Sequence, residues 1–391
     1  MACDAALIIY ILISTLIFRS RFLLYVKFAH EYDRRLKIGV IGCGKHAFRF
    51  IYPALRYLPV ELKSVCSRSK EKAEACAKSF GAEHSYSDYH EMLSREQLDA
   101  VLVITDYDPS GCPKYPAIAI DCMRAGVHVW IEKPPAASVA QILEMRAVSV
   151  ETGKIVLVGF KKMFYPAVER AREIVSGKDF GKLTSISIRY GTSLPFSTAN
   201  RNESIKMKRF LDDFMHPASL LQLFGGPARS VYFQINELTG ASSSVLMFEN
   251  GVIGNLYLAG GQAETSPRER LELVGEGANL VIENGVELTY YRKGPLLTKA
   301  LLEQGVTNGY GRISSYIGDD SVAPIVWKPE FSLGQLNSNS IFLMGYYQEL
   351  LCFTEAVLNN IRPDRATLDD ALGILKLFEA YKREPGIEIA L

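Results

Sequence analysis

Two side chains able to move a proton lie four residues apart in the segment RFLDDFMHPASLLQLFGG. If this segment is helical, Asp212 and His216 project from the same face. A carboxylate beside an imidazole orients the ring and supports its protonated form, which a general acid/base for alcohol and ketone interconversion requires. The same spacing fits an ordinary pair at a helix start, and spacing alone favours that simpler interpretation.

The stretch GVIGCGKHAF, residues 39–48, fits two nucleotide-binding motifs in different frames. From Gly39 it is G-x-x-x-x-G-K, a P-loop in which His46 replaces the final Ser or Thr. A P-loop needs that hydroxyl to hold Mg²⁺, and Gly39 lies inside a predicted strand, so a phosphotransferase is the weaker hypothesis. It stays open because VLVIT followed by Asp106 resembles a Walker B strand.

From Gly42 the same stretch is G-x-G-x-x-A, the fingerprint of a dinucleotide-binding turn between a strand and a helix. Gly42 would permit the tight turn, and Gly44 would let the backbone approach the pyrophosphate. Lys45 and His46 then lie where the helix begins and its amides face the phosphate charge. We therefore expect a nicotinamide dinucleotide here, and no metal site.

The end of the second predicted strand, VCSRSKEK, indicates which dinucleotide binds. NAD enzymes usually place an acid there for the ribose 2′-hydroxyl, whereas this chain has Ser67, Arg68 and Ser69. Because an acid would repel a 2′-phosphate and Arg68 would attract it, we expect NADP, with NAD as the alternative. Ser69 is better explained as the N-cap of the next helix.

Glu132-Lys133-Pro134 follows the apolar run VHVWI, at the edge of the sheet where doubly wound folds bind ligands. An ammonium at Lys133 could stabilise negative charge on a substrate oxygen, and Glu132 could contact the nicotinamide ribose. Thr105 and Asp106, which follow another buried-looking strand, are expected at the same edge. Taken alone, E-K-P is more often an exposed turn.

Composition restricts the class of partner. The formal net charge is +1, which gives no electrostatic reason to expect nucleic acid. The seven cysteines include no C-x-x-C pair, which suggests reduced thiols in a reducing compartment, so we expect a cytoplasmic protein with a small-molecule ligand.

The N-terminal residues 1–34 contain an uninterrupted apolar run from Ala5 to Phe18. The run is short for a membrane span, which needs roughly 20 apolar residues, and no basic residue precedes it as in a signal peptide. We expect residues 1–34 to be an extension outside the folded domains, with membrane contact only if the segment is retained and inserts.

The next segment, residues 35–158, alternates apolar strands with helical patterns. The strand-like runs are LKIGVIG, VELKSVC, AVLVIT, VHVWI and KIVLVGF. Continuous apolar runs separated by helices predict a doubly wound parallel sheet, a Rossmann dinucleotide-binding domain.

Residues 159–391 have a different pattern, which predicts an α+β domain for substrate binding and oligomer contacts. Strand-like runs follow in close succession from SVYFQIN to VELTYYRKG, with hairpin turns at 249–251 and 283–285. We expect an open antiparallel sheet, a helix near 216–224, two closing helices in 341–360 and 367–383, and a loop over 294–339.

Together, G-x-G-x-x-A, E-K-P and D-x-x-x-H resemble the glucose-fructose oxidoreductase / inositol dehydrogenase / MocA (Gfo/Idh/MocA) family from about Arg35 onward. The resemblance implies hydride transfer between a nicotinamide and a ring hydroxyl or keto group of a sugar, sugar derivative or cyclitol, in a homo-oligomer (dimer or tetramer). It implies that Lys133 polarises the substrate oxygen, that His216 transfers the proton, and that Asp212 hydrogen-bonds substrate or His216.

Some positions depart from the family pattern. Ser219 stands where many members have an acid, KMKRF replaces a glycine cluster, Met163 replaces an arginine beside Lys162, and the loop DYDPSGCPK is longer than usual. These departures put the substrate in doubt, and a phosphate- or nucleotide-bearing sugar stays open. The alternative function is a non-catalytic nucleotide-binding member that acts as a sensor or scaffold.

Overall fold

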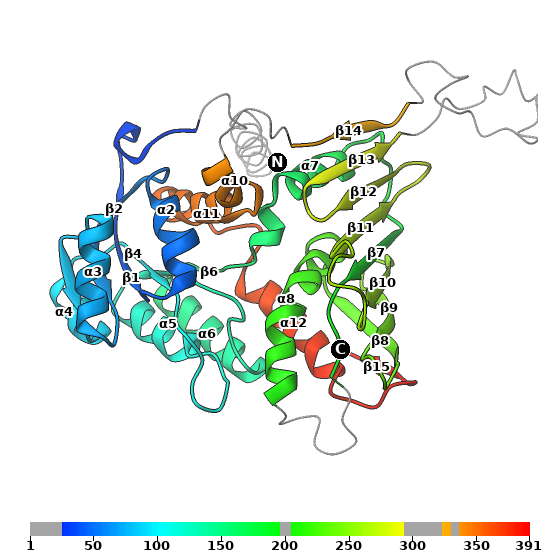
Figure 1. Cartoon of the computed structure of the whole chain (residues 1–391), viewed down its shortest axis with the longest axis horizontal. Helices are drawn as coiled ribbons and strands as arrows, with labels where there is room; N and C mark the ends of the chain where they lie inside the picture. The colour runs from blue at the N-terminus through cyan, green and yellow to red at the C-terminus, as the bar shows by residue number, and fades with distance from the viewer. Residues whose placement is uncertain (1–25, 196–204, 293–322, 330–335) are drawn as a thin grey trace, which may run out of the picture.

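The computed structural model describes residues 26–195, 205–292, 323–329 and 336–391, with the side chains of 336–339 excepted. Two sheets with helices packed against them account for most of these residues (Figure 1). The apolar run Ala5–Phe18 and most of the predicted loop 294–339 lie outside the described residues. No helix in the described ranges has the length and apolar character needed to cross a bilayer.

The first sheet confirms the doubly wound prediction. All six strands are parallel, in the order β3-β2-β1-β4-β5-β6, and β4 is buried at every residue because helices cover both faces. The strands are β1 (Leu36–Ile41), β2 (Val60–Cys66), β3 (His84–Tyr86), β4 (Ala100–Val103), β5 (His128–Ile131) and β6 (Val156–Val158). The helices are α2 (Tyr52–Leu55), α3 (Lys70–Phe80), α4 (Tyr89–Arg95), α5 (Tyr115–Arg124) and α6 (Val139–Thr152).

The helix caps follow the sequence signals. Ser69 Oγ accepts a hydrogen bond from the Lys72 amide, which confirms it as the N-cap of α3, and Gly81 ends that helix in the left-handed region. The helix after the glycine turn is less regular than predicted. It opens with a π-helical turn, Ala47–Ile51, because Pro53 has no N–H to complete the ordinary bonding pattern.

The second sheet has nine strands in the order β14-β13-β12-β11-β7-β10-β9-β8-β15 (Figure 1). Its strands are β7 (Ser185–Tyr190), β8 (Ala228–Ile235), β9 (Ser242–Phe248), β10 (Ile253–Leu258), β11 (Glu269–Val274), β12 (Asn279–Glu283), β13 (Glu287–Tyr291), β14 (Ile325–Trp327) and β15 (Glu388–Ala390). The hairpins β9–β10 and β12–β13 are confirmed, but β7 pairs with β10 in parallel, so the sheet is mixed.

Two helices differ in length from the prediction. The helix expected near 216–224 is α8 (Ile205–Gly225), which runs through Pro217. Proline is favoured at helix starts, which is why the sequence suggested a later beginning. The closing pattern 341–360 is two helices, α10 (Leu336–Leu343) and α11 (Tyr346–Asn359), which are separated at Gly345, where φ is +74°.

Two of the remaining helices join the two halves. α7 (Pro166–Val175) packs on β12 and β13, while α12 (Leu368–Ala380) packs on both α6 and α8. α11 returns to the first sheet, where it contacts β5 and lies beside α2 (Figure 1). The chain's last helices therefore help to build the edge at which β1, β4 and β5 end.

Candidate active site

The glycine turn after β1 decides between the two motif frames. Gly42 has φ +130°, and a side chain there would overlap the carbonyl oxygen of Ile104, so the turn requires glycine. Nothing lies within 4 Å of a Cβ placed at Gly44, so its backbone is open to a ligand. Gly39 is inside β1, paired with Ser64 and Val101, and the P-loop frame is therefore wrong.

Beyond the turn, Lys45 is exposed and His46 contacts the E-K-P segment. His46 Nε2 lies 2.9 Å from Glu132 Oε1, while Glu132 Oε2 accepts a hydrogen bond from the Lys133 amide at 2.7 Å. Both oxygens of Glu132 are thus engaged within the chain. A ribose hydroxyl that bonds Glu132 would compete with the imidazole of His46.

The side chains expected to select the cofactor form a surface ion-pair network. Arg68 Nη2 lies 2.7 Å from Asp106 Oδ2, and Lys114 Nζ lies 3.2 Å from Asp106 Oδ1. Burial acts to raise the pKa of Asp106, but Lys114 and Arg68 outweigh it, and the pKa is lowered. Ser67 donates its amide to Tyr86 of β3. A 2′-phosphate at Arg68 would have to displace the carboxylate of Asp106.

Lys133 and Asp212, which are 79 residues apart in the chain, meet between the two sheets. Lys133 Nζ donates to Asp212 Oδ1 at 2.8 Å and to the Asp212 carbonyl at 3.3 Å. Lys133 follows β5 and Asp212 lies on α8, so the pair joins the two halves of the chain. The structure therefore brings these two predicted residues together.

His216 lies one helical turn after Asp212, but its surroundings differ from the expectation. No carboxylate of the described residues bonds its imidazole, which instead packs against Tyr190 with ring centroids 6.3 Å apart. Burial lowers the pKa of His216 well below its usual value, and nearby cations lower it further: Lys133, Lys162, Lys161 and Arg268. The ring is therefore neutral at pH 7, the form that accepts a proton.

Sequence reasoning missed a group of buried titratable residues behind Glu132. Lys161 Nζ donates to the Tyr346 hydroxyl at 2.9 Å and lies 4.4 Å from the centre of that ring. Burial lowers the pKa of Lys161 to about 8. Glu349, fully buried on α11, has no hydrogen-bond partner on either oxygen within the described structure, and burial followed by Glu132 raises its pKa well above normal. In the sequence, this helix resembles ordinary amphipathic core.

The position beside the replaced arginine carries a second buried lysine. Lys162 forms an ion pair with Glu269 of β11, and both side chains are at most 9% exposed. Its ammonium lies 4.9 Å from the ring centre of Tyr190, the ring that also contacts His216. Lys162 therefore holds a positive charge close to the imidazole, while Met163 is buried in the core.

The edge of the first sheet fits a dinucleotide. The glycine turn leaves its backbone uncovered at Gly44, and Thr105, at the carboxyl end of β4, has a buried hydroxyl with no partner among the described residues. Buried hydroxyls normally have a hydrogen-bond partner, so a ligand polar group fits there. Thr105 and Glu132 would hold ribose or nicotinamide groups.

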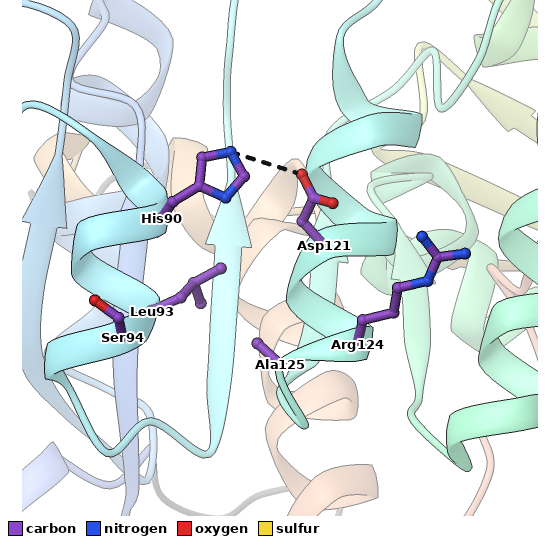
Figure 2. Close-up of a pocket in the computed structure, with 6 residues that line it drawn as sticks. All are labelled: His90, Leu93, Ser94, Asp121, Arg124 and Ala125. Atoms are coloured by element: carbon purple, nitrogen blue, oxygen red, sulfur yellow. Dashed lines mark ion pairs between the residues drawn. The ribbon is translucent and has the colours of Figure 1, made fainter.

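A separate surface depression of about 290 Å³ lies between α4 and α5 (Figure 2). His90 Nε2 lies 3.9 Å from Asp121 Oδ2 across it, and Leu93 and Arg124 complete its sides. None of the predicted site residues lines this depression, so we do not assign it to the active site.

Comparisons with known proteins agree with this fold. Residues 36–160 match the model of the Gfo/Idh/MocA oxidoreductase family, an NAD-binding Rossmann fold. The chain is 34% identical over 144 residues to a 4-carboxy-2-hydroxymuconate-6-semialdehyde dehydrogenase of Sphingobium sp., covering 37% of this chain and 44% of the relative. It is 24% identical over 281 residues to D-xylose 1-dehydrogenase (NADP(+)) 2 of Haloferax volcanii, covering 68% of this chain and 83% of the relative.

Solved structures extend the likeness to the second sheet. A dehydrogenase from Chromobacterium violaceum superposes with a TM-score of 0.71 at 19% identity, covering 88% of this chain and 94% of the other. The sequence match to the Sphingobium enzyme spans less than half of that relative's length. The match to the Gfo/Idh/MocA family model therefore covers the Rossmann half of the chain, and the solved structure shows a similar fold over both halves.

Proposed function

We propose that the chain is an NADP-preferring dehydrogenase or reductase acting on a ring hydroxyl or keto group of a sugar, sugar derivative or cyclitol. The observation that supports this most is the 2.8 Å contact between Lys133 Nζ and Asp212 Oδ1, one helical turn from His216. An ammonium, a carboxylate and a neutral imidazole at the carboxyl edge of a dinucleotide-binding sheet are the groups that alcohol oxidation requires.

A nicotinamide dinucleotide held by the turn at Gly44 and by Thr105 and Glu132 would supply the acceptor and donor of the hydride. Lys133 donates an N–H to the substrate oxygen and stabilises the negative charge that develops there. During oxidation, the hydroxyl proton passes to the neutral imidazole of His216, and during reduction the protonated ring returns it to the carbonyl oxygen. The lowered pKa of His216 favours the base role at neutral pH.

Cofactor preference depends on Arg68 in this proposal. NADPH and NADH would be titrated by fluorescence against the wild type, Arg68→Ala and the control Arg95→Ala. Both arginines are exposed, 77% and 67%, and each pairs with one carboxylate in the described structure. A charged hydrogen bond of about 1.5–3 kcal/mol predicts a loss of roughly tenfold or more in NADPH affinity for Arg68→Ala alone. Equal losses for both dinucleotides would contradict the assignment.

The activity itself would be tested with D-xylose and myo-inositol as first probes, with NADP⁺ and NAD⁺, in the wild type and His216→Asn. Turnover by the wild type that His216→Asn abolishes, with NADPH affinity unchanged, is the expected result. Full activity of His216→Asn would remove the imidazole from the mechanism. Dinucleotide binding without turnover of any sugar or cyclitol would favour the binding-only function.

We also propose a homo-oligomer that forms through the outer face of the second sheet. Tyr232, Val245, Ile253 and Tyr257 are exposed on neighbouring strands there, and the strand pairing puts them on one face. Val245→Asp should lower the mass measured by light scattering, whereas the control Leu238→Asp, 92% exposed in the β8–β9 turn, should not. An unchanged mass for Val245→Asp would exclude this face.

A further inference from the structure

The Lys133–Asp212 contact has a third member. Tyr107 donates its hydroxyl to Asp212 Oδ1 at 2.7 Å, the same oxygen that accepts from Lys133 Nζ at 2.8 Å. Two donors on one carboxylate oxygen fix its position more narrowly than either alone. Tyr107 comes from the nucleotide-binding half and Asp212 from α8, 105 residues later in the chain.

The loop that carries Tyr107 is built to hold this position. Tyr107 and Pro113 form an isolated bridge, and Asp108 Oδ1 accepts from the Cys112 amide at 2.8 Å and from the Ser110 hydroxyl at 2.7 Å. Gly111 completes the turn with φ +80°. These bonds close residues 107–113 into a compact turn, so the phenol has little freedom to move away from Asp212.

The same turn is tied to the helix that carries the carboxylate. Lys208, one turn before Asp212 on α8, donates Nζ to the Ser110 carbonyl at 2.6 Å. The loop thus contacts two neighbouring turns of α8, one at Lys208 and one at Asp212. Both contacts with α8 come from the loop DYDPSGCPK, residues 106–114.

We propose that Tyr107 is a positioning residue, which holds the Asp212 carboxylate on Lys133 and away from the imidazole of His216. Asp212 and His216 share a helical face, so a carboxylate released by Tyr107 can turn toward the ring. A carboxylate beside an imidazole favours the protonated form, which cannot accept the substrate proton. Tyr107 thus preserves the unprotonated form of His216. The effect of Tyr107 on catalysis rests on the proposed function, whereas its hydrogen bond to Asp212 does not.

The charges around His216 are consistent with this role. Among the described residues, the charges that act on the ring from other elements are cations, and three of them engage carboxylates: Lys133 with Asp212, Lys162 with Glu269, and Arg268 with Asp213. Lys161 contacts the neutral hydroxyl of Tyr346. Asp212 is therefore the carboxylate whose turning would change the charge at the ring most directly, because it lies on the same face of α8.

The contact with Asp212 also determines how many N–H donors of Lys133 remain for a substrate. An ammonium has three N–H donors, and two of them go to Oδ1 and the carbonyl of Asp212. The third is left for a substrate oxygen. Burial and the Asp212 charge raise the pKa of Tyr107, so its hydroxyl stays a donor over the whole working pH range.

The test is the pKa of the His216 ring, measured by NMR on the full chain with isotope-labelled histidine and no added nucleotide. His216→Asn identifies the signal among the six histidines. In Tyr107→Phe, we expect this pKa to rise by about half a unit or more, the scale of shift that a nearby carboxylate produces. The control Tyr291→Phe removes a phenol of similar exposure, 46%, on β13 and should leave this pKa unchanged.

A double-mutant comparison separates positioning from a general structural effect. In an Asp212→Asn background, Tyr107→Phe should cause no further shift, because the charge that it releases is gone. An unchanged pKa in Tyr107→Phe, or an equal shift in both backgrounds, would overturn the proposal. Because the measurement needs neither cofactor nor substrate, a failure of the proposed enzymatic function would not be mistaken for a failure of this inference.

Discussion

Lys161 allows a quantitative prediction of stability, because burial disfavours its charged form. Lowering the pKa of a lysine from 10.5 to about 8 corresponds to about 3.4 kcal/mol of disfavoured charge at neutral pH. Replacement by methionine removes that cost but also the Tyr346 hydrogen bond, worth about 1 kcal/mol, and the ring contact, worth about 1 kcal/mol. We therefore expect Lys161→Met to raise the free energy of unfolding by about 1–2 kcal/mol at pH 7.

The stability difference between Lys161→Met and the wild type should also depend on pH. Since the folded-state pKa lies below the unfolded value, the native chain binds fewer protons than the unfolded chain between about pH 8 and 10.5. In that window, Lys161 makes the wild type more stable as the pH rises, whereas the variant lacks this contribution. The advantage of Lys161→Met should therefore shrink between pH 7 and pH 9.5.

Urea denaturation followed by tryptophan fluorescence measures the stability difference at pH 7 and its change with pH. The control is Lys178→Met, because Lys178 is exposed. A variant that is less stable than the wild type at pH 7 would show that the contact with Tyr346 and the nearby carboxyl groups of Glu132 and Glu349 outweigh the cost of burying the ammonium. An advantage that does not change with pH would show that burial of the charge is not its cause.

Three further predictions follow from single positions. Gly42→Ala should cost several kcal/mol of stability and abolish NADPH binding, because its side chain would overlap the Ile104 carbonyl. The control is Gly126→Ala, since Gly126 also has a positive φ but has open space around it. Its effect on the thermal shift and on the NADPH titration should be far smaller. Ser69→Ala should lose about 1 kcal/mol in urea denaturation without changing the ratio of NADPH to NADH affinity, because its hydroxyl caps α3; a changed ratio would assign it to the cofactor. The rate of oxidation should persist below pH 6.5, since the lowered pKa keeps His216 neutral there; an acid limb at or above pH 6.5 in kcat/KM would contradict this.

The first sheet was predictable because its signals are local. Each of the five predicted strands is a short apolar run bounded by a helix pattern, and the caps at Ser69 and Gly81 are set by residues within a few positions. β3 and α4 were missed because three partly polar strand residues and a seven-residue helix carry almost no periodicity. The parallel pairing of β7 with β10 is a long-range choice that hairpin turns cannot reveal.

The sequence motifs indicate the residue types of the candidate site but not how its side chains pair. The motifs located Lys133, Asp212 and His216, but the four-residue spacing suggested an Asp212–His216 contact that the structure replaces with Lys133. The sequence could not show this, because both donors to Asp212 come from loops about 80 and 105 residues away. Lys161 and Glu349 were missed for a related reason: only folding places them behind Glu132.

The contacts of Asp212 with Lys133 and Tyr107 explain how the imidazole of His216 stays neutral although a carboxylate lies one turn away on the same helix. The spacing of Asp212 and His216 alone would favour an ion pair, worth about 0.2–0.5 kcal/mol on an exposed helix. The structure offers Asp212 two stronger partners, an ammonium at 2.8 Å and a phenol at 2.7 Å, and charged hydrogen bonds are worth about 1.5–3 kcal/mol. The local Asp212–His216 pair is therefore weaker than the long-range contacts, and His216, close to four cations, stays unprotonated, as the proposed mechanism requires.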